Sequence, residues 1–279
     1  MKVELFPFQK TALARLRQSV ATALGNYRGT HTPQVVSYTA PTGAGKTIVM
    51  SALIEAIYYG DELYPDQNEA IFIWLSDSPQ LNEQSRLKID LKADKIRLNQ
   101  CVVISDDSFD MEVLEDGHIY FLNTQKLSKS SNLTKHSDGR QYTIWETLAN
   151  TVREKADRLY FIIDEAHRGA QNARDLTKNT TIMQKFLKGS DADNLPPMPV
   201  VIGMTATPQR FNRLAEGIQS TTHYVKTTAD EVRASGLLKD RIVITYPEHA
   251  GNDMAVLQAA TDEWKDKCLH WHDYTEKQH

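Results

Sequence analysis

The first place in the chain where chemistry could be done is a glycine-containing turn between an apolar run at 35–39 and a helix. The turn begins with Ala40, where the strict pattern has glycine, and continues through Thr42, Gly43, Ala44, Gly45, Lys46 and Thr47. Because glycine has no Cβ, its backbone can point successive N–H groups at one anion, and the next helix directs its positive end there. A lysine can then bind the β- and γ-phosphates, and a threonine hydroxyl can hold Mg²⁺. The turn therefore predicts that the chain binds a nucleoside triphosphate with Mg²⁺.

A pair of acids follows the apolar run at 159–163. These acids are Asp164 and Glu165. An acid at the end of a buried strand can hold Mg²⁺ opposite the threonine of a phosphate-binding turn. The next acid can orient or deprotonate the attacking water. We therefore predict that Asp164 is a metal ligand and that Glu165 acts in triphosphate hydrolysis.

Apolar strands and amphipathic helices alternate along most of the chain. Helices are expected at 9–25, 46–60, from 79, 144–152, 183–187, 228–236 and from 253, and strands at 35–39, 70–75, 102–104, 119–122, 159–163, 200–204 and 242–244. This alternation predicts an α/β fold with a doubly wound, mostly parallel sheet and a ligand at the carboxyl ends of its strands. We expect one domain, with a core over roughly residues 30 to 245.

Composition narrows the class of protein less than the motifs do. The chain has 279 residues, a net charge of −4 and an ordinary globular share of hydrophobic residues, 41%. Any nucleic-acid contact must therefore come from a local patch. Only two cysteines occur, which argues against a disulfide framework. With no apolar leader or membrane-length segment in the sequence, we expect a cytoplasmic protein that does not bind membranes.

A third motif, Thr-Ala-Thr-Pro at 205–208, follows another apolar strand. The ordered set of the glycine turn, Asp-Glu-Ala-His at 164–167 and this segment resembles the first RecA-like domain of superfamily 2 helicases and translocases. The resemblance covers nearly the whole chain. It implies a single RecA-like, phosphate-loop ATPase domain that uses ATP and Mg²⁺. The site residues that it implies are Lys46 and Thr47 for phosphate and Mg²⁺, Asp164 for Mg²⁺, Glu165 for water, and His167, Thr205 and Thr207 for linking nucleotide state to nucleic-acid grip.

Further segments fit the same resemblance. Phe8 and Gln9 precede a helix and are similar to the adenine-reading glutamine motif, with Gln9 bonding the base edge beside an aromatic ring. Leu81 and Gln84 fall where the family has its first nucleic-acid-contacting segment. Thr124 and Gln125 belong to Asn-Thr-Gln-Lys-Leu at 123–127, which resembles the second such segment in the branch of type III and type I restriction enzymes.

The resemblance also implies a domain plan. We expect an N-terminal helix with the glutamine motif at 1–30, the RecA-like ATP-binding domain at 31–246, and a helical tail at 247–279 that leads to a second RecA-like domain. The Gln-x-x-Gly-Arg-x-x-Arg motif of that second domain does not occur in this sequence. Because an arginine finger is worth ~10³–10⁵ in rate in related chemistry, we expect this chain to bind ATP and to hydrolyse it slowly.

The function that these motifs predict is the ATP-driven motor domain of a DNA helicase or translocase related to restriction or phage defence. The expected partners are double-stranded DNA, a second RecA-like domain and methyltransferase or defence-system subunits. Two alternatives stay open. One is a nucleotide-gated module that binds nucleic acid or a partner without moving, and the other is an RNA helicase. The sequence does not choose between DNA and RNA, or between unwinding and translocation.

Two weaker signals favour ordinary surface structure. Lysines at 126, 129 and 135 with Arg140 belong to or flank a serine- and lysine-rich segment at 128–140, which predicts a solvated loop more than a phosphate-backbone contact. Cys268, His270 and His272 lack a fourth ligand for zinc, so a surface helix is the better interpretation.

Overall fold

The computed structural model describes residues 1–105, 108–128, 130–137, 139–164, 182–207, 211, 221–237 and 253–276. The chain divides into two compact units, Met1–Leu238 and Lys239–His279. The strand expected at 242–244 lies outside the described residues.

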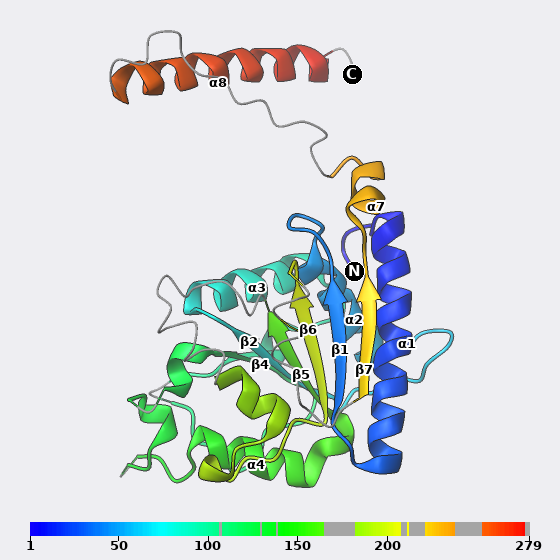
Figure 1. The fold of residues 1–279 in the computed structure, drawn as a ribbon, viewed down its shortest axis with the longest axis vertical. Coiled ribbons are helices and arrows are strands. Elements are labelled where there is room, and N and C mark those ends of the chain that lie inside the picture. The colour runs from blue at the N-terminus through cyan, green and yellow to red at the C-terminus, as the bar shows by residue number, and fades with distance from the viewer. Residues whose placement is uncertain are drawn as a thin grey trace. The chain divides into compact units, whose positions relative to one another are not determined.

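The first unit is built on one sheet of seven strands in the order β3-β4-β2-β5-β6-β1-β7 (Figure 1). The strands are β1 Gln34–Thr39, β2 Ile71–Ser76, β3 Cys101–Val103, β4 Ile119–Asn123, β5 Leu159–Asp164, β6 Val200–Thr205 and β7 Thr221–Lys226. Every neighbouring pair is parallel. The predicted doubly wound α/β fold is therefore confirmed, and the sheet is parallel throughout.

Helices cover both faces of this sheet. They are α1 Pro7–Thr30, α2 Lys46–Tyr59, α3 Pro79–Lys92, α4 Ile144–Lys155 and α7 Ala229–Ala234, with further helix at residues 182–188. One apolar core joins α1, α2 and α3 to side chains such as Phe72 and Trp74 of β2. The other joins α4 and residues 182–188 to the alternate residues Ile71 and Ile73. A central strand buried on both faces explains the continuous apolar runs of the sequence.

The second unit is described by its single helix, α8 Asp253–Glu276. Its large apolar side chains are exposed, including Trp264 and Trp271. None of the helices in the described residues is long and apolar enough to cross a membrane.

The first helix is longer than the sequence predicts. Gly25 was expected to end it, whereas α1 continues to Thr30 and is capped by His31, whose left-handed backbone has φ 55° and whose N–H donates to Tyr27 O at 2.7 Å. A glycine inside a helix is unfavourable by only about 0.5–1 kcal/mol relative to alanine. The buried face of α1, with Leu16 and Val20 fully inside, offsets that amount.

The segment at 128–140 is less exposed than expected. Leu133 is fully buried, and Arg140 is 7% exposed. The Arg140 guanidinium donates from Nε to Phe109 O at 3.1 Å and from Nη1 to Asn132 O at 2.5 Å. A buried cation needs such partners, so Arg140 fastens the segment instead of facing solvent.

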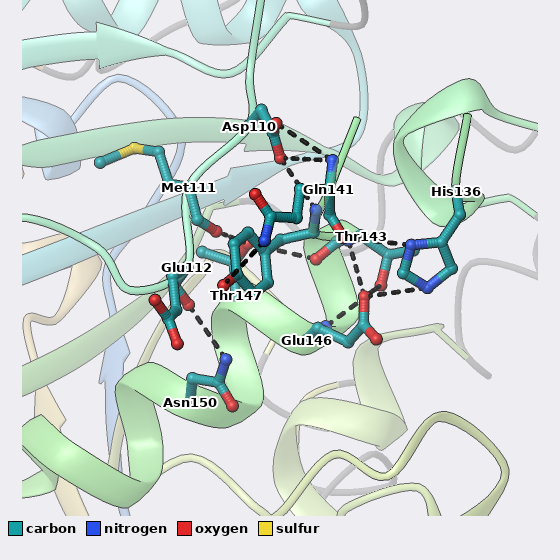
Figure 2. A network of polar contacts seen from close by, with 10 residues as sticks. Asp110, Met111, Glu112, His136, Gln141, Thr143, Glu146, Thr147 and Asn150 are labelled. Carbon is teal, nitrogen blue, oxygen red and sulfur yellow. Dashed lines mark hydrogen bonds and ion pairs between the residues drawn. The ribbon is translucent and has the colours of Figure 1, made fainter. Parts of the chain in front are cut away.

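Figure 2 shows the polar network that holds the neighbouring loop to α4. Asp110 accepts from the backbone N–H groups of Gln141 and Tyr142 at 3.0 and 2.9 Å. These bonds to Tyr142 and Gln141 lower the pKa of Asp110. Thr143 caps α4 and donates to the Glu146 carboxylate at 2.8 Å, which also faces His136 at 3.3 Å. The segments that contain Asp110 and His136 are thus both fixed at the start of α4.

Close packing on β6 gives a testable consequence. A Cβ at Gly203 would lie 2.2 Å from ring atoms of the buried Phe211. We expect Gly203→Ala to lower the free energy of unfolding by about 1–3 kcal/mol, because the ring must move. The control is Gly25→Ala in α1, where a Cβ meets nothing within 4 Å and about 0.5–1 kcal/mol of stabilisation is expected. Denaturant unfolding of both variants measures the difference, and a neutral Gly203→Ala would contradict the packing.

Candidate nucleotide site

The predicted phosphate-binding turn joins β1 to α2. Gly43 and Gly45 have φ values of 87° and 76°, which residues with a side chain rarely adopt. Gly45 is the N-cap of α2, so the first turn of that helix opens at Lys46. The Lys46 ammonium donates to Ala40 O and Pro41 O, both at 3.3 Å. The turn is therefore shaped as the sequence predicts, with its lysine held over it.

A cavity of about 300 Å³ lies against this turn. Its lining consists of Thr42, Gly43, Gly45, Lys46, Thr47, Leu81, Gln84, Ser85, Lys88 and Asp164. The cavity brings together residues from the turn, from α3 and from the end of β5. Leu81 and Gln84, for which a nucleic-acid contact was predicted, face the same cavity, and that contact stays a prediction.

Asp164 ends β5 and is 8% exposed. The hydroxyl of Ser85, which is itself buried, donates to Asp164 Oδ2 at 3.2 Å. A buried carboxylate beside a helix N-terminus, a lysine and a threonine hydroxyl is the donor set that a triphosphate and Mg²⁺ require. The residues present fit both groups.

Gln9 is tied directly to the turn. Its Nε2 donates to Ala44 O at 3.0 Å, and its Oε1 accepts from Phe6 N at 3.1 Å. Gln9 is 3% exposed, so these two bonds fix its buried amide against the turn; its contact with a base edge stays a prediction. Ala44 itself is fully buried and contributes through its carbonyl.

The aromatic ring next to Gln9 differs from the expected one. Phe8 is 7% exposed and belongs to the apolar core, whereas Phe6 is 39% exposed and stacks against Phe8 with 6.1 Å between centroids. Sequence reasoning missed Phe6. The signal was present, because Phe6 directly precedes Pro7, a residue type that favours the first helical position, so Phe6 lies outside the helix.

The predicted pair at the end of β4 divides into one buried and one exposed residue. Thr124 is 1% exposed and donates to Asp77 O at 3.2 Å and to Asp77 Oδ1 at 3.3 Å. Burial raises the pKa of Asp77, and the bond from Thr124 partly opposes that rise. Gln125 is exposed. Lys126 donates to Ile104 O at 2.6 Å. Of the two predicted residues, only Gln125 is exposed to solvent, where it could contact nucleic acid.

The third motif touches the phosphate-binding turn through the backbone. Ala40 N donates to Thr205 O at 3.2 Å, and Thr207 N donates to Thr205 Oγ1 at 2.9 Å. Thr205 is 2% exposed. A displacement of this motif would therefore move or break its hydrogen bond to Ala40, the first residue of the turn.

Two predicted catalytic residues, Glu165 and His167, lie outside the described residues. Their roles on water and in coupling stay predictions. Sequence reasoning also missed Ser85 and Lys88, which line the cavity. Helical spacing from Leu81 and Gln84 could have found them, since residues three and four apart share a face.

Comparisons with known proteins found one family model and several solved structures that are similar to this chain. A family model described as the res subunit of type III restriction enzymes matches residues 2–210. Among solved structures, the Pyrococcus furiosus Hef helicase domain matches with 16% identity and a TM-score of 0.41, covering 79% of this chain and 39% of that one. S. cerevisiae Dbp5 bound to RNA and ADP BeF3 matches with 13% identity and a TM-score of 0.36, covering 78% of this chain and 50% of that one.

The DEAD-box helicase Mss116 bound to ssRNA and UDP-BeF matches with 15% identity and a TM-score of 0.40, covering 80% of this chain and 44% of that one. The chain thus spans half the length of these structures or less. No curated protein sequence matches it.

The contact between Gln9 and the turn can be tested by adding one methyl group. A Cβ at Gly45 would lie 2.6 Å from Gln9 Nε2, and its φ of 76° is strained for alanine. We expect Gly45→Ala to destabilise the fold by about 1–2 kcal/mol from the backbone alone. Gly43→Ala has similar strain but no atom within 4 Å. The Tm of Gly45→Ala should therefore be lower than the Tm of Gly43→Ala. In a Gln9→Ala background, the difference between these two Tm values should shrink. An equal effect of the two alanines would contradict the contact.

Proposed function

Because this chain belongs to the family of type III restriction enzyme res subunits, we propose that it is the motor domain of an ATP-dependent DNA helicase or translocase. Family membership makes it a helicase-like ATPase motor domain. The DNA substrate and a role in restriction or phage defence are the proposal. The observation that supports the ATP-dependent part of the proposal is one cavity that is lined by Lys46 and Thr47 of the turn and by Asp164 of β5.

Residues of the cavity, together with Glu165, Gln9 and Phe6, have distinct roles in this proposal. Backbone N–H groups of the turn bind phosphate oxygens, and Lys46 neutralises their charge. Thr47 and Asp164 hold Mg²⁺, which when bound stabilises the charge that develops on the transferred phosphate. Glu165 orients the attacking water. Gln9 and Phe6 are proposed to read and stack the adenine base, with Phe6 replacing Phe8 as the exposed ring.

Coupling to nucleic acid follows from the contacts of the third motif. Thr205 is bonded to Ala40 at the start of the turn, so a change in phosphate occupancy can be transmitted to Thr207. Gln125 is exposed at the end of β4 and is the candidate for contact with DNA. His167 is proposed to act in the same coupling.

Partners and domain limits are part of the proposal. We place the ATP-binding domain at 31–246, preceded by the helix of the glutamine motif and followed by a tail at 247–279 that leads to a second RecA-like domain. Such a domain would supply arginines to the nucleotide. We therefore expect this chain to hydrolyse ATP slowly, at a rate ~10³–10⁵ below that of a motor with both domains. Methyltransferase or other defence-system subunits are the further partners that the family suggests.

Binding of ATP is tested first at Lys46. We expect Lys46→Ala to weaken MgATP binding by roughly a hundredfold, because two charge-assisted bonds are lost. The control is Lys135→Ala, an exposed lysine that does not line the cavity. Calorimetric titration with MgATP measures the affinity, and thermal unfolding shows that each variant is folded. Unchanged affinity in a folded Lys46→Ala protein would refute the nucleotide site.

The nucleic-acid substrate is tested by ATP turnover. We expect a slow steady-state rate that double-stranded DNA raises more than RNA does. Glu165→Gln should keep ATP affinity and remove the turnover, because the group that orients water is neutralised. Stronger stimulation by RNA would identify an RNA helicase. ATP-dependent affinity for nucleic acid without turnover would identify a gated binding module.

A further inference from the structure

One face of α3 forms the cavity wall opposite the phosphate-binding turn. The residues on this face are Leu81, Gln84, Ser85 and Lys88. Their spacing places them on successive turns of one side of the helix. Ser78 fixes the start of α3, since its Oγ accepts from Leu81 N at 3.4 Å, with Pro79 at the first helical position. The wall is therefore a regular helix with a defined origin.

Ser85 connects this wall to the acid of β5. It lies 79 positions from Asp164 in sequence, is 4% exposed and donates its hydroxyl hydrogen to Oδ2 at 3.2 Å. A buried carboxylate is unfavourable unless hydrogen bonds stabilise its charged form. A donor from a rigid helix also fixes the direction in which the carboxylate points. Ser85 thus orients the proposed metal ligand.

Lys88 places a second lysine at the cavity, one turn beyond Gln84. Its side chain is exposed, and it forms neither a hydrogen bond nor an ion pair with any residue in the described part of the chain. The neighbouring cation on the same helix, Arg86, is instead paired with Glu83 through bonds of 3.1 and 2.7 Å and does not line the cavity. Lys88 is therefore a cation available to a ligand in the cavity.

We propose that α3 is the metal- and phosphate-holding wall of the nucleotide site. Ser85 is a positioning residue that orients Asp164 toward Mg²⁺, and Lys88 is a second cation that binds the phosphates. This inference rests on the proposed function, since both roles require MgATP in the cavity. Leu81 and Gln84 lie on the same helix, so bound nucleotide would also fix the position of these two residues.

The two roles respond differently to Mg²⁺, which makes them separable. Affinities for ATP are measured by calorimetry with Mg²⁺ and with a chelator. Ser85→Ala should reduce the Mg²⁺-dependent gain in affinity by about tenfold and leave Mg²⁺-free binding unchanged. Ser85→Thr, which keeps the hydroxyl, should restore most of the gain. Thermal unfolding of the ligand-free variants verifies the fold.

Lys88→Ala should weaken ATP by about tenfold both with and without Mg²⁺, and the loss should shrink at high salt. Lys88→Arg should retain most of the affinity. Arg86→Ala is the matched control, because it removes a cation from the same helix outside the cavity. Inorganic tripolyphosphate, used as the probe without a base, should show the same loss in Lys88→Ala.

The outcomes separate this inference from the proposed function. Wild-type binding of MgATP together with unchanged affinities in Ser85→Ala and Lys88→Ala would overturn the inference alone. A loss in Ser85→Ala that is equal with and without Mg²⁺ would overturn the positioning role of Ser85. A loss in Arg86→Ala equal to that in Lys88→Ala would overturn the phosphate role of Lys88. Failure of the wild-type chain to bind MgATP would overturn both the inference and the proposed function.

Discussion

The site depends on the parallel pairing of three central strands. In the register of the sheet, Met204 of β6 lies opposite Tyr38 of β1 on one side and Asp164 of β5 on the other. Parallel strands end at the same edge, so the turn after β1, the acid that ends β5 and Thr205 of β6 emerge at one level. Apolar side chains on both faces fix this register, because a slip of one residue would turn every buried side chain to the wrong core. The turn at 42–47 and Asp164, far apart in the sequence, thus line one cavity.

Several residues that the sequence marks as functional also hold the structure together. Gln9 bonds the turn through Ala44 O, and Thr124 bonds Asp77 between neighbouring strand ends. Buried polar groups are unfavourable without partners, so these residues are fixed in place before any ligand binds. A site of this kind is preorganised, and its polar residues cannot be divided cleanly into structural and functional ones.

Sequence patterns predicted the parts of the fold that depend on apolar periodicity. The central strands and the capping box at Thr228 and Glu231 were found, since both are local signals. β7 was not found, because Val225 is its only buried residue and its polar side chains give no apolar run. Ser85 was missed for a different reason. Helical spacing places it on the same face as Leu81 and Gln84, but its hydrogen bond to Asp164 of β5, 79 positions away, leaves no local pattern in the sequence.

The charge of the chain also has to be understood locally. With a net charge of −4, attraction to DNA cannot come from the whole molecule. Lys126 and Arg140, the cations nearest the end of β4 that sequence reasoning weighed, both donate to backbone carbonyls. Their charges therefore stabilise the loops beside the sheet. Under the proposed function, contact with DNA at this edge is assigned to exposed polar groups such as Gln125. Such contacts position a backbone without reading its sequence, as a motor that must move along many sequences requires.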